Sequence, residues 1–168
     1  MIRALVLADT HIRPGRARRL PDAVYAELAR CDLVLHAGDV VTHDLLDELA
    51  GFAPVHAVLG NNDHALVGRL PETDVMTLAG VPVAMVHDSG ARIGRERRMA
   101  RRFPGARVVV FGHSHAPENR AGLDGQLLFN PGSPTDRRAQ PHHTYGVLEL
   151  DGGEVISHTI VSVEPSRP

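Results

Sequence analysis

Residues 2–11 read Ile-Arg-Ala-Leu-Val-Leu-Ala-Asp-Thr-His, an apolar run that stops abruptly at polar side chains. The run is short and rich in Val, Leu and Ile, which is typical of a buried strand. At its end stand Asp9 and His11, a carboxylate and an imidazole two residues apart. An Asp-X-His pair often arises by chance, so its meaning depends on how the other strands of the chain end.

Four further apolar runs predict strands at residues 33–37, 55–59, 81–86 and 108–111. Segments with helical spacing lie between these strands. They cover residues 22–30 behind Pro21, residues 43–50 with Thr42 as the N-cap, and a stretch from about Ser89, its expected N-cap, to Arg102. Strands that alternate with helices are typical of a parallel α/β fold.

The chain becomes rich in β-forming residues after Gly112. Residues 127–129, 144–150 and 154–163 are predicted strands, and Asp151-Gly152-Gly153 is a hairpin turn between the last two. Residues 75–78 and 81–86 are expected to form a second hairpin. We therefore expect an α/β protein in which two sheets pack face to face with helices outside.

The composition bounds the class of protein. With 168 residues, 43% of them hydrophobic, the chain can bury the core of a single domain, expected over residues 1–163 with a tail at 164–168. The chain has 18 basic residues, all of them Arg, and 20 acidic residues, so its net charge is −2. This charge balance excludes a protein that binds nucleic acid over a broad basic surface. The single cysteine, Cys31, excludes disulfides and cysteine metal clusters. Because no export leader and no run of about 18 apolar residues is present, we expect a cytoplasmic protein that does not enter membranes.

One strong charge run covers residues 92–107, which contain seven arginines. As a helix, this segment would place Ile93, Ala100 and Phe103 roughly on one face and turn most of the arginines outward. The run is therefore either a solvated helix face or a contact for phosphate or a partner.

Polar side chains stand where these strands end. Seven of them have metal-ligand chemistry: Asp9, His11, Asp39, Asn61, His87, His113 and His115. The carboxyl ends of parallel strands meet at one edge of a sheet, so we expect these side chains to converge. Gly38, Gly60 and Gly112 each precede a candidate, where the chain must turn sharply without a Cβ in the way.

The residue types narrow the metal chemistry. Carboxylates, imidazoles and a carboxamide, without thiolate, favour Mn, Fe, Ni or Zn, and the ligands alone leave the choice among these open. Asp39, on a short turn, is the natural ligand to bridge two ions. Two aspartates offset only half the charge of two divalent ions, so the site would attract a phosphate anion. The sequence therefore predicts phosphoester hydrolysis.

These motifs, in their order, resemble those of the calcineurin-like metallophosphoesterases. The matching motifs are Asp9-X-His11, Gly38-Asp39, Gly60-Asn61, His87, Gly112-His113-X-His115 and Asn130-Pro131-Gly132-Ser133. The resemblance covers roughly residues 2–163 and is strongest to the small single-domain bacterial and archaeal phosphodiesterases. It implies a four-layer α/β/β/α sandwich of two mixed sheets flanked by helices.

The resemblance also implies a ligand set for two divalent transition-metal ions, with Mn first and Ni, Fe or Zn as alternatives. One ion would take Asp9, His11, Asp39 and His115. The other would take Asp39, Asn61, His87 and His113, so that Asp39 is shared. A hydroxide held between the ions would attack phosphorus in line, while Asn61 and Asn62 orient the phosphate.

Two positions depart from the family pattern. Many members carry a His where this chain has Asn62, and because Asn cannot transfer a proton at neutral pH, no general acid is assigned. His64, close by along the chain, is either that acid or a plain loop residue. Asp88 follows His87 where Gly is usual. His36, inside a predicted strand, is expected to support the ligands or the core and not to bind metal.

The sequence thus predicts a metal-dependent phosphodiesterase. The core elements use nearly the whole chain and leave no room for a cap domain, so we expect an open site and a small or exposed phosphodiester substrate. Two alternatives stay open: a protein-interaction scaffold, as in a retromer subunit of this fold whose metal site has degraded, and a phosphomonoesterase or protein phosphatase. A scaffold should lose ligands, whereas all seven are present here. A homo-oligomer is also compatible with the sequence.

Overall fold

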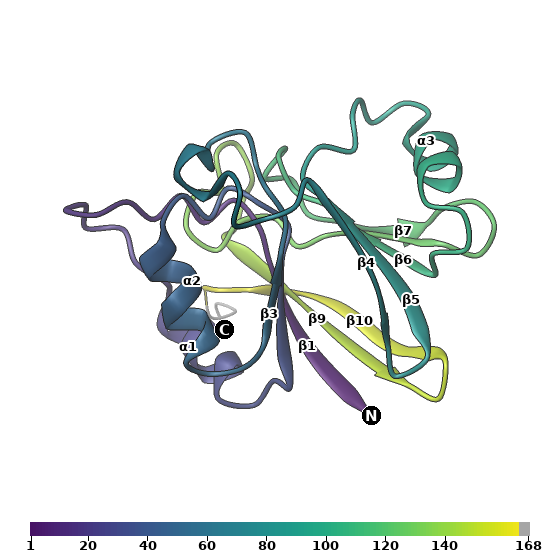
Figure 1. Ribbon diagram of the computed structural model, residues 1–168, viewed down its shortest axis with the longest axis horizontal. Helices are drawn as coiled ribbons and strands as arrows, with labels where there is room; N and C mark the ends of the chain where they lie inside the picture. The colour runs from purple at the N-terminus through teal and green to yellow at the C-terminus, as the bar shows by residue number, and fades with distance from the viewer. Residues whose placement is uncertain (165–168) are drawn as a thin grey trace.

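Two mixed sheets of five strands each form the centre of the structure, a computed structural model that describes residues 1–164 (Figure 1). The first sheet has the order β10-β9-β1-β2-β3, with β1 (Ile2–Leu7), β2 (Leu33–His36), β3 (Val55–Ala57), β9 (Thr144–Asp151) and β10 (Glu154–Ser162). The second has the order β4-β5-β6-β8-β7, with β4 (Thr73–Leu78), β5 (Val81–Val86), β6 (Val108–Val110), β7 (Glu118–Ala121) and β8 (Leu127–Asn130). Of the expected tail, residues 165–168 lie outside the described residues.

Each sheet combines parallel and antiparallel pairs. β1 runs parallel to β2, with Ala4 opposite Leu33, and antiparallel to β9, with Ala4 opposite Leu148. In the second sheet β5, β6 and β8 are parallel, and the edge strands β4 and β7 are antiparallel to their neighbours. Each sheet therefore contains both the parallel strands and the hairpin strands that the sequence predicts.

Helices cover the outer faces of the two sheets. Successive side chains of β1 point to opposite faces, so Ala4 and Val6 lie between the sheets, while Leu5 and Leu7 pack under the helices. Those helices are α1 (Asp22–Leu28) and α2 (His43–Ala50), and α3 (Arg95–Arg102) lies against the second sheet (Figure 1). This order of layers confirms the α/β/β/α sandwich. No helix within residues 1–164 has the length and hydropathy needed to cross a membrane.

α3 begins later than the sequence predicted. Its N-cap is Gly94, whose φ of 71° places the chain in the left-handed conformation just before the helix, and Ser89 lies in the preceding loop. Ile93 is therefore outside the helix and 91% exposed, so the expectation that it shares a helix face with Ala100 and Phe103 is wrong. Met99 and Phe103 pack under the helix.

Most arginines of the run 92–107 point outward as expected, but two of them turn inward. Arg95 is buried, with its guanidinium carbon 4.8 Å from the ring centre of Phe111. Its guanidinium also forms an ion pair with the carboxylate of Glu118. Arg98 donates hydrogen bonds of 3.2 and 3.0 Å to carbonyl oxygens of the loop 88–94. The guanidinium groups of both side chains thus hold the loop before the helix. The other five arginines of the run are exposed.

The strand β7 is absent from the sequence prediction. Its four residues, Glu-Asn-Arg-Ala, include no large apolar side chain. The strand forms at the sheet edge by pairing with β8, with Glu118 opposite Asn130. A pairing partner, and not a local pattern, decides such an edge strand.

Candidate metal centre

The candidate ligands lie just beyond the carboxyl ends of five strands. β1 leads to Asp9 and His11, β2 to Asp39, β3 to Asn61, β5 to His87, and β6 to His113 and His115. Packing of the two sheets brings these ends together although the residues are distant in sequence. The contacts described below join all seven side chains.

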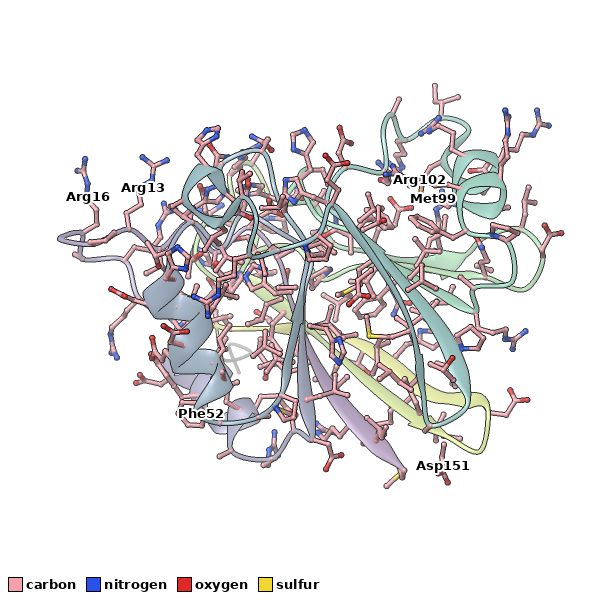
Figure 2. The ribbon with its side chains drawn as sticks, viewed as in Figure 1. Arg13, Arg16, Phe52, Met99, Arg102 and Asp151 are labelled. Atoms are coloured by element: carbon pink, nitrogen blue, oxygen red, sulfur yellow. The ribbon has the colours of Figure 1, made fainter. Side chains whose placement is uncertain are left out.

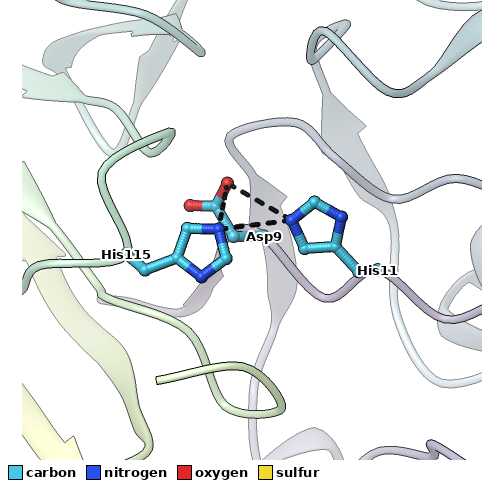
Figure 3. A group of neighbouring side chains, drawn as sticks. All are labelled: Asp9, His11 and His115. Atoms are coloured by element: carbon cyan, nitrogen blue, oxygen red, sulfur yellow. Dashed lines mark hydrogen bonds and ion pairs between the residues drawn. The ribbon is translucent and has the colours of Figure 1, made fainter. Parts of the chain in front are cut away.

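Asp9, His11 and His115 form one group (Figure 3). Nε2 of His115 lies 3.5 Å from Oδ1 of Asp9 and 3.3 Å from Nε2 of His11. Nε2 of His11 lies 4.0 Å from the same Asp9 oxygen. Nitrogen and oxygen atoms that crowd around one point in this way are suitable ligands for a divalent ion.

A second group joins Asp9 to Asp39 and His87. Nε2 of His87 lies 3.5 Å from Oδ2 of Asp39 and 3.9 Å from Oδ1 of Asp9. The same Asp39 oxygen lies 3.4 Å from Nε2 of His11, so Asp39 stands between the two groups. Both carboxylates are therefore placed between the two groups, whereas the resemblance assigns the bridging role to Asp39 alone.

Asn61 and His113 extend the chain of contacts. Oδ1 of Asn61 lies 3.1 Å from Nε2 of His87 and 3.0 Å from Nδ1 of His113. The seven candidates thus form one continuous cluster, with His115 at one end and His113 at the other. Its extended form suits two neighbouring ions better than one.

Asp9 tests whether this cluster suits a cation. Its carboxylate is fully buried, and neither oxygen has a hydrogen-bond partner within residues 1–164. Burial, together with the negative charge of Asp39, raises the pKa of Asp9 to about 8. A buried carboxylate without donors is destabilising unless a cation completes it. The donor set therefore fits divalent metal ions.

Hydrogen bonding and burial shift the pKa values of three other candidate ligands. Burial acts to raise the pKa of Asp39, but the backbone N–H and side-chain amide of Asn62, each 2.8 Å from an Asp39 oxygen, hold that pKa below its usual value. Burial lowers the pKa of His11 and of His115. Both imidazoles are therefore neutral at neutral pH, the form in which histidine binds metal.

Backbone carbonyl groups orient two of the imidazoles. Nδ1 of His87 donates to the carbonyl oxygen of Ala37 at 2.7 Å, and Nδ1 of His115 donates to that of Asp136. With the proton on Nδ1, the lone pair of each ring lies on Nε2 and points at the carboxylates. Such outer contacts are typical of histidines that bind metal.

The backbone is strained where it carries the ligands. Five of the nine non-glycine residues with positive φ in the described chain are candidates, namely Asp9, His11, Asp39, His113 and His115, with φ between 46° and 69°. Each such conformation costs about 1 kcal/mol or more for a residue with a Cβ. Strain of this kind concentrates at functional sites, where the surrounding structure imposes it.

Glycines make room for these turns, as the sequence suggested. A Cβ on Gly60 would lie 2.2 Å from the backbone nitrogen of Asp39, and one on Gly38 would lie 2.6 Å from Nδ1 of His87. Gly38 also has a φ of 92°. A side chain at either position would displace a candidate ligand.

Asp63 supports the cluster, and the sequence analysis missed it. Its buried carboxylate accepts hydrogen bonds from the backbone N–H groups of Asp39 (2.9 Å), Gly60 (2.7 Å) and Val41 (2.6 Å). It thereby ties the loop after β2 to the loop after β3. A signal in the sequence that could have identified Asp63 is its position at the end of Gly-Asn-Asn-Asp, two residues after the candidate ligand Asn61.

The segment 130–133 ties together the turns after β1 and β6. Oγ of Ser133 donates to the carbonyl oxygen of Asp9 at 2.8 Å. Nδ2 of Asn130 donates to the carbonyl oxygen of Gly112 at 3.1 Å. The last motif of the sequence therefore acts on the backbone of the ligand-bearing turns and not on a ligand side chain.

Asn62 and His64 border the cluster. Both line a hollow of about 650 Å³, and Asn62 also holds Asp39 through the two bonds described above. His64 is exposed on the short 3₁₀ turn η1 (His64–Leu66). Asn62 is thus part of the cluster's support, whereas His64 shares only the hollow with it.

Two further predicted positions shape the ligand loops. His36 is fully buried, and its Nε2 lies 3.1 Å from Oγ1 of Thr10, the residue between Asp9 and His11. Asp88 accepts a hydrogen bond of 2.7 Å from the N–H of its second following residue and so closes a tight turn in the loop after β5.

Comparison with known proteins identifies relatives along nearly the whole chain. Residues 2–153 match the model of the calcineurin-like phosphoesterase superfamily domain. A probable metallophosphoesterase of Methanothermobacter thermautotrophicus is 35% identical over 162 residues, which cover 95% of this chain and 92% of that protein. The matched range therefore spans all seven candidate ligands as well as the core.

Two solved structures share the fold. Vps29 of Entamoeba histolytica, complexed with Zn²⁺, superposes with a TM-score of 0.75 at 24% identity and covers 97% of this chain and 100% of its own. An archaeal phosphodiesterase superposes with a TM-score of 0.69 at 18% identity and covers 95% of this chain and 100% of its own. Together with the family match over residues 2–153, these findings show that the chain belongs to the calcineurin-like phosphoesterase superfamily.

Proposed function

We propose that this protein is a phosphodiesterase that works with two divalent transition-metal ions, Mn first and Ni, Fe or Zn as alternatives. The observation that carries the proposal is the buried carboxylate of Asp9, which has no hydrogen-bond partner within residues 1–164 and lies inside a cluster of seven ligating side chains. One ion would be held by Asp9, His11, Asp39 and His115, and the other by Asp39, Asn61, His87 and His113. A pair of bound ions supplies a nucleophile at neutral pH and stabilises charge on phosphoryl oxygens.

The protein's own groups hold and orient the reacting partners. The neutral imidazoles and strained turns preset the ligand geometry, so little reorganisation is needed when substrate binds. Because Oδ1 of Asn61 faces His87 and His113, its Nδ2 group is turned away from both rings and is available to a phosphate oxygen. Asn62 uses one N–H of its amide on Asp39, and the other, which has no partner within residues 1–164, can donate to the phosphate.

Two observations support a diester as the substrate. The side chain at position 62 is an amide, which cannot protonate a leaving group or add the cationic contact that a dianionic monoester needs. The archaeal phosphodiesterase described above has the same fold.

A hydrolysis panel on metal-reconstituted protein tests the proposal. It compares bis(p-nitrophenyl) phosphate, cyclic nucleotides and p-nitrophenyl phosphate. We expect kcat/KM for the aryl diester to exceed that for the aryl monoester by at least about tenfold. A faster monoester would identify a phosphomonoesterase instead.

A protein-interaction scaffold is the second candidate, and the likeness to Vps29 is the observation that favours it. A scaffold has no use for a preset ligand cluster, so its strained turns would bring no benefit. Metal-loaded protein that hydrolyses nothing in the panel would favour this alternative over catalysis.

We propose the cytoplasm as the place of action. The thiol of Cys31 is free, and a protein with one free cysteine fits a reducing compartment. Fractionation of cells that express a tagged chain would test this.

Elemental analysis of the purified protein is expected to find two ions per chain after loading with Mn²⁺ or Ni²⁺ and removal of the excess. The reason is that the seven side chains make two four-ligand sites when one carboxylate is shared. His142→Ala, which removes an exposed imidazole outside the cluster, should leave the stoichiometry unchanged. Saturation at one ion or none would contradict the binuclear centre.

The hydrolysis rate is expected to fall steeply as the pKa of the leaving group rises, because an amide stands where an imidazole would assist departure. His64→Ala should slow aryl and alkyl diesters equally and by less than about threefold, since the exposed side chain shares only the hollow with Asn62. A loss above about tenfold that is confined to alkyl diesters would identify His64 as the acid. Metal content is measured in both proteins so that a loosened site is recognised.

A further inference from the structure

A turn beside the cluster presents two arginines on one side of the chain. Residues 13–16 read Arg-Pro-Gly-Arg, and the N–H of Arg16 donates to the carbonyl oxygen of Arg13 at 3.3 Å. Pro14 in the second position and Gly15, with φ of 69°, in the third are the residues favoured in a type II turn. Such a turn brings its first and last Cα atoms within about 7 Å. The two side chains accordingly stand side by side (Figure 2).

Neither of these guanidinium groups has an ion pair or hydrogen bond within residues 1–164, whereas the next two arginines are engaged. Arg18 pairs with Asp136 at 3.6 Å, and Arg19 pairs with Asp22 at 3.3 Å. The first pair also anchors the turn to the cluster, because the carbonyl oxygen of Asp136 accepts the proton of Nδ1 of His115. Because the chain as a whole has a net charge of −2, these two adjacent unpaired cations form a local positive patch on an otherwise slightly acidic protein.

Both unpaired arginines border the candidate metal centre. They line the hollow of about 650 Å³ together with Asn62, and a second hollow of about 370 Å³ together with His11. Arg13 follows His11 by two residues, so their Cα atoms are at most about 7 Å apart. A group bound by the arginines would therefore lie beside a phosphate held at the cluster.

The larger hollow also has an apolar wall. Val41, Pro14 and Ala65 supply it, and Asp44 is the acidic residue among those that line the hollow. Val41 has a φ of 83°, which is rare for a β-branched residue, and its N–H is held by Asp63 at 2.6 Å. An apolar wall next to cationic groups suits a ligand with a flat organic part and an anionic end.

We propose that Arg13 and Arg16 bind a second phosphate group of the substrate, so that the substrate is a phosphodiester that also carries a phosphomonoester. This inference rests on the proposed function and names its substrate class. Paired guanidinium groups bind phosphate oxygens through charge-assisted, bidentate hydrogen bonds. A bound dianion would also relieve the repulsion between the two adjacent cations.

Calorimetry on the Mn-loaded protein tests the proposal with two ligands that differ by one phosphate, thymidine 3′,5′-bisphosphate and thymidine 5′-monophosphate. We expect the bisphosphate to bind about tenfold more tightly at low ionic strength, and the preference to shrink in about 0.5 M salt. The double variant Arg13→Ala/Arg16→Ala should bind the two ligands equally. The matched control Arg97→Ala/Arg101→Ala removes two exposed charges from α3 and should keep the preference.

Two results would overturn the inference. They are equal affinities of the unmodified protein for the two nucleotides, and a preference that persists in the Arg13→Ala/Arg16→Ala variant. Hydrolysis of bis(p-nitrophenyl) phosphate by the same preparations is measured in parallel. Hydrolysis without a nucleotide preference removes only this inference, whereas a protein that hydrolyses no diester removes the proposed function and this inference with it.

Discussion

Asp39→Asn is expected to lower kcat/KM for bis(p-nitrophenyl) phosphate by about 10³-fold or more. Oδ2 of Asp39 lies between His11 and His87, so the loss of its negative charge weakens both ends of the cluster. The new amide would also turn an N–H group toward Asn62, which donates to both oxygens of the present carboxylate. Steady-state kinetics at saturating Mn²⁺ measures the effect.

His11→Ala is the informative comparison for this variant. Because its imidazole belongs to one end of the cluster, we expect a loss of about 10- to 100-fold that is partly recovered at higher Mn²⁺ concentration. Asp22→Asn, the same chemical change on an exposed carboxylate of α1, should leave activity unchanged. Equal losses for Asp39→Asn and His11→Ala at saturating metal would contradict the bridging role of Asp39.

Asp9→Asn is expected to stabilise the metal-free protein while it removes most of the stabilisation by Mn²⁺. A neutral amide avoids the cost of either protonating or charging this buried carboxyl next to Asp39, and its N–H can donate to Nε2 of His115, which lies 3.5 Å from the present Oδ1. We expect a gain of about 1–2 kcal/mol in the free energy of unfolding, which corresponds to about 5 °C in a chain of this size. Thermal unfolding in EDTA measures this gain.

The same measurement with Mn²⁺ tests Asp9 as a ligand. An ion at 100 times its Kd adds about 2.7 kcal/mol, so the unmodified protein should gain about 5–10 °C and the variant less than half of that. Because the pKa of Asp9 is raised to about 8, the metal-free folded state binds a proton that the unfolded chain releases. Its stability therefore falls as pH rises from about 4 to about 8, and the advantage of the variant grows over that window. A variant that keeps the full gain from Mn²⁺ would show that Asp9 is not a ligand.

Elements with a strong local pattern could be predicted, and elements that depend on a neighbour could not. α2 spans residues 43–50 as expected, because Thr42 accepts the N–H of Leu45 and an apolar stripe faces the sheet. The start of α3 was misplaced because Ser89 has the side chain of an N-cap but lies in a loop that Arg95 and Arg98 hold by tertiary contacts. A capping residue signals a helix start only where the backbone turns there.

Apart from β7, the order of the strands and helices could be predicted from the sequence, as could the polar residues at the strand ends. Both are properties of short segments, since burial follows hydrophobic periodicity and a parallel strand must end at a turn. Three other properties follow from the packing of distant segments. Neither oxygen of Asp9 has a partner in the described chain, Asp63 accepts hydrogen bonds from three backbone N–H groups, and Arg13 has no counter-ion within residues 1–164. These properties depend on distances between segments far apart in the chain. His11 and His115, for example, are 104 positions apart in sequence, yet their Nε2 atoms are 3.3 Å apart. The physical reason is that a side chain's identity states what it can bind, whereas packing decides which of its possible partners is within reach.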